Sequence, residues 1–144
     1  MSKEIIEKAI NIIDENAIQG GEFHGQFCTL SLIDEDGFPT SAVLTPSKAD
    51  GLNWLTFATR LDENRAKRAA NCNRASVSFA SAEYCVNLVG EIEVITDIDV
   101  KREMWYDSLS YHVTGPDDPN YSVLKFTTKR YKLFINGEEV ARTL

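Results

Sequence analysis

The side chains best suited to chemistry gather between Trp54 and Phe79, a segment that reads as a strand, a short basic helix and a second strand. Six hydrogen-bond donors, most of them cationic, crowd the loop and the helix start: Thr59, Arg60, Asn64, Arg65, Lys67 and Arg68. Such groups at a helix N-terminus are suited to holding a phosphate. The alternative is a solvated helix face on which the arginines pair with Asp62 and Glu63, since charge runs commonly face solvent.

The rest of the chain is acidic, and the 144 residues carry a net charge of −7. Nucleic-acid partners usually require a broad basic surface, and anionic membranes attract basic segments. The composition therefore predicts no nucleic-acid partner and no membrane partner. It makes the cationic segment a local site for a small anion.

Targeting and redox features predict a cytoplasmic protein. The sequence contains no run of about 18 apolar residues, so no transmembrane helix is predicted. The N-terminal sequence MSKEIIEKAI lacks the apolar block of a signal peptide. Three cysteines, Cys28, Cys72 and Cys85, show no CxxC or Cys/His spacing. No metal site is therefore predicted, and thiols in a reducing compartment are expected.

Hydrophobic periodicity predicts a single domain over residues 1–144. Apolar side chains recur at helical spacing over residues 3–17 and predict an amphipathic helix within 1–18, ended by the stretch 19–22. Strands are predicted where apolar and polar residues alternate or small residues gather, at 27–33, 40–45, 54–58, 75–80, 84–95, 122–127 and 130–135. A loop is expected at 46–53, and a short tail after Asn136-Gly137.

Two further helices are expected, at 61–71 and from Thr96-Asp97 to about Leu109. Gly90, inside the longest strand, predicts a bulge or sharp bend of the kind that barrels need. Hairpin turns join most strands. We therefore predict a mainly β fold with α, a barrel of six to seven antiparallel strands with about three flanking helices.

Several short motifs follow one another in a characteristic order. They are Asp36-Gly-Phe-Pro39, Trp54-Leu-Thr-Phe-Ala-Thr59 with the basic helix after it, Ala75-Ser-Val-Ser-Phe79, Val89-Gly-Glu-Ile-Glu-Val94, Trp105 in the helix opened by Asp97, Gly115-Pro-Asp-Asp-Pro-Asn-Tyr121 and Leu124-Lys-Phe126. With this order over residues 20–136, the chain resembles the pyridoxamine 5′-phosphate oxidase-like, FMN-binding split-barrel proteins, in particular their general stress protein branch.

The resemblance implies a split β-barrel that forms a homodimer and binds two FMN molecules in clefts at the interface. The family's phosphate grip lies at the helix start after the third strand and usually reads Ser-Arg-Lys. Here the place reads Glu63-Asn64-Arg65, with Lys67 one step further on. Arg can replace Lys at a phosphate as a bidentate fork, whereas Glu63 suits a phosphate only if its carboxylate turns away.

On the second strand the family tends to have Arg-Pro-Met, near the isoalloxazine ring and the ribityl chain. Ala42, Val43 and Leu44 stand there instead. The arginine contact is therefore lost, while main-chain groups of Val43 and Leu44 remain for the ring edge. The resemblance thus implies an FMN-binding set of Ala42, Val43, Leu44, Thr59, Arg60, Asn64, Arg65 and Lys67.

Other residue types carry less information. Three aromatic residues could form a stacking wall for a flavin or pack into the core: Trp105, Tyr106 and Tyr111. His24 and His112 lack partners at ligand spacing and are expected at the surface. No general acid or base is named, because a flavin carries its own redox chemistry.

Two functions on this fold stay open. The first is an FMN-dependent oxidoreductase acting between the flavin and a nicotinamide or small organic substrate. The second is a non-enzymatic stress protein that holds a flavin or another phosphate-bearing ligand, which Ala42 and Glu63 favour. A third possibility is a lipocalin-like barrel enclosing an apolar ligand. Oxidation of pyridoxamine phosphate itself is not expected, because only Arg142 is basic after Phe134.

Overall fold

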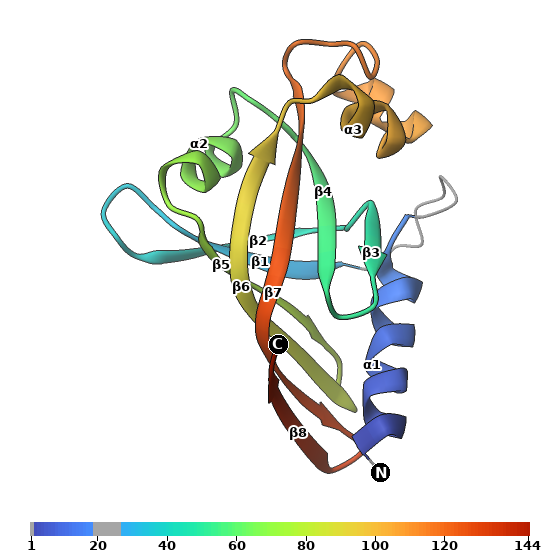
Figure 1. The fold of residues 1–144 in the computed structure, drawn as a ribbon. Helices are drawn as coiled ribbons and strands as arrows, with labels where there is room; N and C mark the ends of the chain where they lie inside the picture. The colour runs from blue at the N-terminus through green and yellow to red at the C-terminus, as the bar shows by residue number, and fades with distance from the viewer. Residues whose placement is uncertain (1, 19–26) are drawn as a thin grey trace.

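The computed structural model describes residues 2–18 and 27–144 as one strongly curved antiparallel sheet with helices at its edges (Figure 1). Its elements are α1 (Ser2–Asn16), β1 (Cys28–Ile33), β2 (Pro39–Leu44), β3 (Lys48–Asp50), β4 (Trp54–Arg60), α2 (Asn64–Asn71), β5 (Arg74–Ala80), β6 (Tyr84–Ile95), α3 (Ile98–Glu103), the 3₁₀ helix η1 (Asp107–Tyr111), β7 (Tyr121–Ile135) and β8 (Glu138–Thr143). The mainly β fold with α that the sequence predicts is confirmed.

The long strand β7 organises the sheet. Hydrogen bonds link the strands in the order β2-β1-β5-β6-β7-β4-β3, and β8 pairs with β7. The first half of β7 pairs with β4 and its second half with β8. The register with β6 shifts between these halves, at Val89 and Gly90. This shift is the bulge that Gly90 predicts. It lies between the part of β7 that pairs with β4 and the part that pairs with β8.

Glycine is required at this bulge by close packing of the backbone. A Cβ atom on Gly90 would lie 2.0 Å from the carbonyl oxygen of Thr127, on the facing strand. Backbone atoms cannot retreat as the end of a flexible side chain can. The bulge therefore depends on the absence of a side chain at one position.

The sheet has eight strands, where the sequence patterns predict six to seven. The expected loop at 46–53 contains β3, and the expected tail forms β8. Asn136 and Gly137 both have positive φ, 52° and 82°, which fits the two-residue Asn-Gly turn that joins hairpin strands. The two strands predicted at 122–127 and 130–135 are halves of β7, because the bulge bends the strand without ending it.

Helix boundaries also differ from the predictions. The expected helix at 61–71 begins at Asn64, because Glu63 has an extended backbone. The expected helix from 97 to 109 is divided into α3 and η1 by Tyr106, which is also extended. The N-terminal helix ends at Asn16. The stretch 19–22, expected to break it, and His24 lie outside the described residues.

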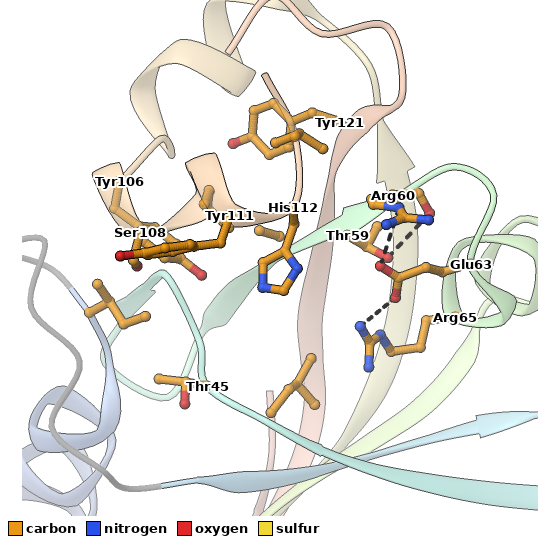
Figure 2. A pocket seen from close by; sticks show the side chains of 15 residues that line it. Thr45, Thr59, Arg60, Glu63, Arg65, Tyr106, Ser108, Tyr111, His112 and Tyr121 are labelled. Carbon is orange, nitrogen blue, oxygen red and sulfur yellow. Dashed lines mark hydrogen bonds and ion pairs between the residues drawn. The ribbon is translucent and has the colours of Figure 1, made fainter. Parts of the chain in front are cut away.

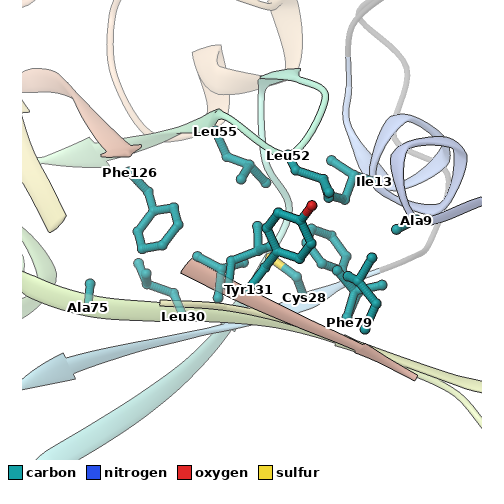
Figure 3. Packing of buried hydrophobic residues seen from close by; sticks show 14 of the residues in the cluster. Ala9, Ile13, Cys28, Leu30, Leu52, Leu55, Ala75, Phe79, Phe126 and Tyr131 are labelled. Atoms are coloured by element: carbon teal, nitrogen blue, oxygen red, sulfur yellow. The ribbon is translucent and has the colours of Figure 1, made fainter. Parts of the chain in front are cut away.

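The barrel core is apolar and is closed on one side by α1. Ile5, Ala9 and Ile13 recur at four-residue spacing along α1 and are buried. They pack with large side chains from the strands, including Phe79 and Phe126 (Figure 3). Burying a side chain of this size contributes about 1.5–3 kcal/mol relative to exposure. The packed core thus supports the end of the barrel that forms one side of the cleft.

Candidate functional site

A cleft of about 390 Å³ lies between the end of the barrel and residues 98–120, a segment that we call the cap. The cap comprises α3, η1 and the loop that leads to β7, and it lies beyond the ends of β6 and β7 in Figure 1. The barrel side of the cleft is lined by Leu44, Thr45, Ala58, Thr59, Arg60, Glu63 and Arg65. The cap side is lined by Tyr106, Ser108, Leu109, Tyr111, His112 and Val113. Ile18 and Tyr121 complete the lining.

Arginines on the barrel side are already engaged by carboxylates. Arg60 donates from Nε and Nη2 to the two carboxylate oxygens of Asp62, both at 3.0 Å. These hydrogen bonds hold the pKa of Arg60 above and that of Asp62 below their ordinary values. Glu63 lies between the two arginines of the cleft (Figure 2). Its Oε2 atom is 2.5 Å from Nη2 of Arg65, and its Oε1 atom is 4.0 Å from Nε of Arg60.

Two polar groups on this side nevertheless have hydrogen-bonding capacity left. The Nε atom of Arg65 is buried and has no hydrogen-bond partner within the described part of the chain. Thr59 is 5% exposed, and its hydroxyl makes only a long 3.5 Å contact with the carbonyl oxygen of Arg60. A buried donor without a partner is costly. An anionic or hydroxyl-bearing ligand at this end of the cleft would relieve that cost, so these residues fit the phosphate or sugar end of a nucleotide.

The cap side is aromatic. Tyr106 is half-buried, and burial raises the pKa of its hydroxyl. Tyr111 is 87% exposed at the mouth of the cleft, next to His112. In Figure 2 the His112 ring faces across the cleft towards Arg65. The cleft therefore has one end suited to an anion or hydroxyl and another suited to a flat ring.

Polar contacts hold the cap on β7. The buried Lys101 donates from Nζ to the carbonyl oxygen of Asp118 at 2.9 Å. In return, the Tyr121 hydroxyl donates to the carbonyl oxygen of Lys101 at 3.0 Å. Trp105 packs edge-on against Tyr121, with ring centroids 5.5 Å apart. These contacts place η1 over the cleft.

The loop before β7 joins the two sides of the cleft. Asp118 accepts hydrogen bonds from the backbone N–H groups of Thr114 and Asn120, both at 2.9 Å. Asn120 accepts from the backbone N–H groups of Leu61 and Asp62, on the turn that leads to α2. The position of the cap is thereby tied to the segment that carries Glu63 and Arg65.

The structure brings together half of the residues that the resemblance implies for FMN. Leu44, Thr59, Arg60 and Arg65 line the cleft. The other four are not part of its lining: Ala42, Val43, Asn64 and Lys67. Val43, Asn64 and Lys67 are instead exposed. Arg68, from the same cationic segment, pairs with Glu35 at 3.2 Å, away from the cleft.

Sequence reasoning missed the contribution of η1. Ser108, Leu109 and Val113 line the cleft. His112 is exposed, as the sequence predicts, and it also lines the cleft. The sequence predicts a continuous helix over 97–109, which would not direct these residues towards the cleft. In the structure the extended backbone of Tyr106 ends the first helix and turns η1 back over the cleft. Of the three aromatic residues that could form a stacking wall, Tyr106 and Tyr111 line the cleft. Trp105 packs against the cap cluster instead, as its helical spacing also allows.

No group of three or more His, Cys, Asp or Glu side chains within residues 2–18 and 27–144 is placed to hold a metal ion. None of the helices in these ranges is both long enough and apolar enough to span a membrane.

Comparison with solved structures shows the same fold in several proteins. A protein related to general stress protein 26, of the pyridoxinephosphate oxidase family, from Clostridium acetobutylicum is 19% identical, with a TM-score of 0.82 over 100% of this chain and 97% of that chain. A general stress FMN/FAD binding protein from Xanthomonas citri is 18% identical, with a TM-score of 0.72 over 99% and 96%. A heme binding protein from Mycobacterium smegmatis is 18% identical, with a TM-score of 0.65 over 92% and 57%.

Sequence comparison gives the family. No curated protein matches the chain. The family model for pyridoxamine 5′-phosphate oxidase matches residues 22–134, which is most of the chain and includes every element of the barrel side of the cleft. The lipocalin-like alternative is thereby excluded. The chain belongs to the pyridoxamine 5′-phosphate oxidase family.

Proposed function

We propose that the protein binds FMN in the cleft between barrel and cap. The observation that carries the proposal is the buried Nε–H of Arg65, which lacks a partner in the described part of the chain, beside the underused hydroxyl of Thr59. Both groups would donate to the phosphate of the ligand. Arginine suits this role because its planar fork matches phosphate oxygens.

The size and lining of the cleft support a mononucleotide. Ligand pockets typically span about 300–1,000 Å³, and 390 Å³ lies near the lower limit. Apolar side chains from both sides, such as Leu44 and Leu109, would cover a flat ring, with Tyr106 and Tyr111 beside it. The proposal therefore assigns phosphate to the Arg65 end and the isoalloxazine ring to the η1 end.

A homodimer is part of the same proposal. The outer faces of β1, β2 and β5 present small polar residues such as Ser31, Ser41 and Ser76, a surface on which a second sheet can pack closely. Val43, on the same face of β2, is 64% exposed and lies next to Leu44, which lines the cleft. A second copy on this face would bury Val43. Sizing chromatography with light scattering tests the dimer, and a monomer at micromolar concentration would contradict it.

The proposed redox reaction would be carried out by the bound flavin, and no side chain of this chain is assigned a catalytic role. Bound FMN supplies hydride and electron transfer. The residues of this chain bind and orient the ligand and shield it from water. We propose oxidoreductase activity on that basis, with reduced nicotinamide or a small organic molecule as the reaction partner.

An absorption spectrum is the direct test. We expect bands of bound flavin between about 350 and 500 nm in protein mixed with FMN and then freed of excess ligand, with quenched FMN fluorescence. The variant Arg65→Met should weaken flavin binding about tenfold, because it removes the Nε–H donor of the cleft that has no partner among the described residues. Lys67→Met is the matched control, since Lys67 is a cation on α2 that does not line the cleft, and it should change the affinity by less than about threefold. Protein that is colourless after mixing with excess FMN and removal of the unbound ligand would refute the proposal.

The second candidate is a flavin-binding protein without turnover. It is favoured by the ion pair that already holds Arg65 and by Ala42, where the family tends to have arginine. Anaerobic mixing of the FMN-loaded protein with NADH or NADPH separates the two candidates. Bleaching of the flavin bands supports the oxidoreductase, and bands that persist with both donors support the binding protein.

A further inference from the structure

Glu63 occupies the place in the cleft that an anionic ligand would need. Its carboxylate lies 2.5 Å from Nη2 of Arg65 and 4.0 Å from Nε of Arg60, and its side chain is 32% exposed (Figure 2). Glu63 has an extended backbone and precedes the first residue of α2, Asn64, so it lies in the turn two residues before Arg65. Glu63 is therefore an internal anion at the Arg65 end of the cleft.

The charges at this end cancel. Arg60 is bound by both carboxylate oxygens of Asp62, and Arg65 is bound by Glu63. Two positive charges thus face two negative ones. A phosphate monoester brings a charge of about −1.5 to −2 at pH 7, so it must displace the Glu63 carboxylate or lie beside it, which repulsion disfavours.

An uncharged ligand meets no such competition. The Nε–H of Arg65 and the hydroxyl of Thr59 remain available while Glu63 stays in place. A sugar hydroxyl can accept from the first and either accept from or donate to the second. The ribityl chain of a flavin ends in such a hydroxyl when it carries no phosphate.

We propose that Glu63 competes with the ligand's phosphate for Arg65, so that the native cleft binds the dephosphorylated flavin, riboflavin, nearly as well as FMN. This inference rests on the proposed flavin function and concerns which form of the flavin is accepted. Glu63 is the specificity-determining residue in this account. Replacing its charge makes the cleft selective for the phosphorylated form.

The test compares dissociation constants for riboflavin and FMN, measured by quenching of flavin fluorescence, in the native protein and in Glu63→Gln. In the native protein the two constants should agree within about tenfold. In Glu63→Gln, FMN should bind about tenfold to hundredfold more tightly, because charge-assisted hydrogen bonds from Arg65 become available. Riboflavin should change by less than about threefold, which also shows that the variant is folded.

Glu35→Gln is the matched control. Glu35 forms an ion pair with Arg68, on the same helix as Arg65 but outside the cleft. The substitution makes the same change in net charge and frees an arginine of α2 in the same way. The ratio of the two constants should stay at the native value. Glu63→Ser serves as a second variant if the Gln side chain keeps Arg65 engaged.

The outcomes separate this inference from the proposed function. Native protein that already binds FMN more than about tenfold more tightly than riboflavin would overturn the role of Glu63 and leave flavin binding intact. So would equal weakening of both ligands in Glu63→Gln and Glu63→Ser, which would make Glu63 a ligand of the ribityl chain. Absence of binding by either flavin in every variant would refute the flavin proposal itself.

Discussion

The protein has two hydrophobic clusters, and they are built differently. The barrel cluster, which includes Phe79 and Phe126, is formed by apolar side chains from the strands and α1. The cap cluster consists of Met104, Leu109, Val113, Tyr121 and Val123. It borders the buried Lys101, and hydrogen bonds to backbone carbonyl groups hold it in place. The barrel cluster is the larger of the two, and the smaller cap cluster is supplemented by individual polar contacts.

This difference gives the cleft one rigid side and one adjustable side. Segments with few buried apolar contacts open at lower free energy than the core of the same protein. Thr59 and Arg60 belong to β4, in the barrel sheet, whereas Tyr106 and His112 belong to the cap. We therefore expect the cap to adjust to a ligand while the barrel keeps its shape. The following predictions test that contrast, beginning with the largest effect.

Gly90→Ala should destabilise the barrel more than any surface or cap substitution. Its new Cβ would meet the carbonyl oxygen of Thr127 at 2.0 Å, which forces backbone atoms apart at the bulge. We expect a loss of more than about 4 kcal/mol in the free energy of unfolding. Gly115→Ala is the control, because no atom lies within 4 Å of its Cβ position in the cap loop. Urea unfolding measures both, and similar midpoints would contradict the requirement for glycine at the bulge.

Truncating one leucine in each cluster compares the clusters directly. Leu88→Ala in the barrel should cost about 3 kcal/mol of global stability and Leu109→Ala in the cap about 2 kcal/mol at most. Hydrogen exchange should show the difference in location. Leu109→Ala should speed exchange in residues 98–120 and leave β5 and β6 unchanged. Faster exchange throughout the barrel in Leu109→Ala would mean that the two clusters form a single cooperative unit.

Tyr121→Phe removes one of the polar contacts that hold the cap. The lost hydroxyl donates to the carbonyl oxygen of Lys101, so the variant leaves a buried acceptor and should lose about 1 kcal/mol. Tyr111→Phe removes an exposed hydroxyl and should change stability by less than about 0.5 kcal/mol. Thermal unfolding of the two variants distinguishes these values. Equal melting temperatures would show that the hydrogen bond to Lys101 contributes nothing.

The smallest effect concerns the pH dependence of the cap loop. Hydrogen bonds from the backbone N–H groups of Thr114 and Asn120 hold the pKa of Asp118 below its ordinary value. A lowered pKa in the folded state means that Asp118 stabilises the loop above its unfolded pKa, about 3.9, and that this stabilisation is lost as pH falls through the folded value.

Asp118→Asn should therefore speed amide exchange in residues 114–120 at pH 7, and the difference from the native protein should shrink at pH values below about 4. Asp117→Asn is the control, since Asp117 makes an exposed ion pair with Arg102. It should leave exchange in the loop unchanged at both pH values. A difference that grows as the pH falls would reverse the assigned role of Asp118.

Much of the barrel could be predicted from the sequence because its signals are local. Alternation of apolar and polar residues predicts β1, β5 and β6, and the bounds of β6 agree with the prediction residue for residue. Gly90 predicts the bulge, and the spacing of Ile5, Ala9 and Ile13 predicts the buried face of α1. The short strand β3 has too few residues to show an alternation of apolar and polar side chains. β8 follows an Asn-Gly turn, which predicts a hairpin only where the residues after it are also recognised as a strand.

The residue types of the candidate site could be predicted from the sequence, but their placement around the cleft could not. The cationic residue types before and within α2 follow from the chain itself, and so does the presence of a glutamate beside them. The pairing of Arg60 with Asp62 and of Arg65 with Glu63 is local, and the charge pattern of the sequence already indicates it. Only the tertiary structure decides that Arg65 faces the cleft while Lys67 does not, and that η1 turns Tyr106 and His112 towards it. The physical reason is distance along the chain. The cap and α2 are far apart in the sequence, and long-range folding alone brings their side chains to the two sides of one cleft.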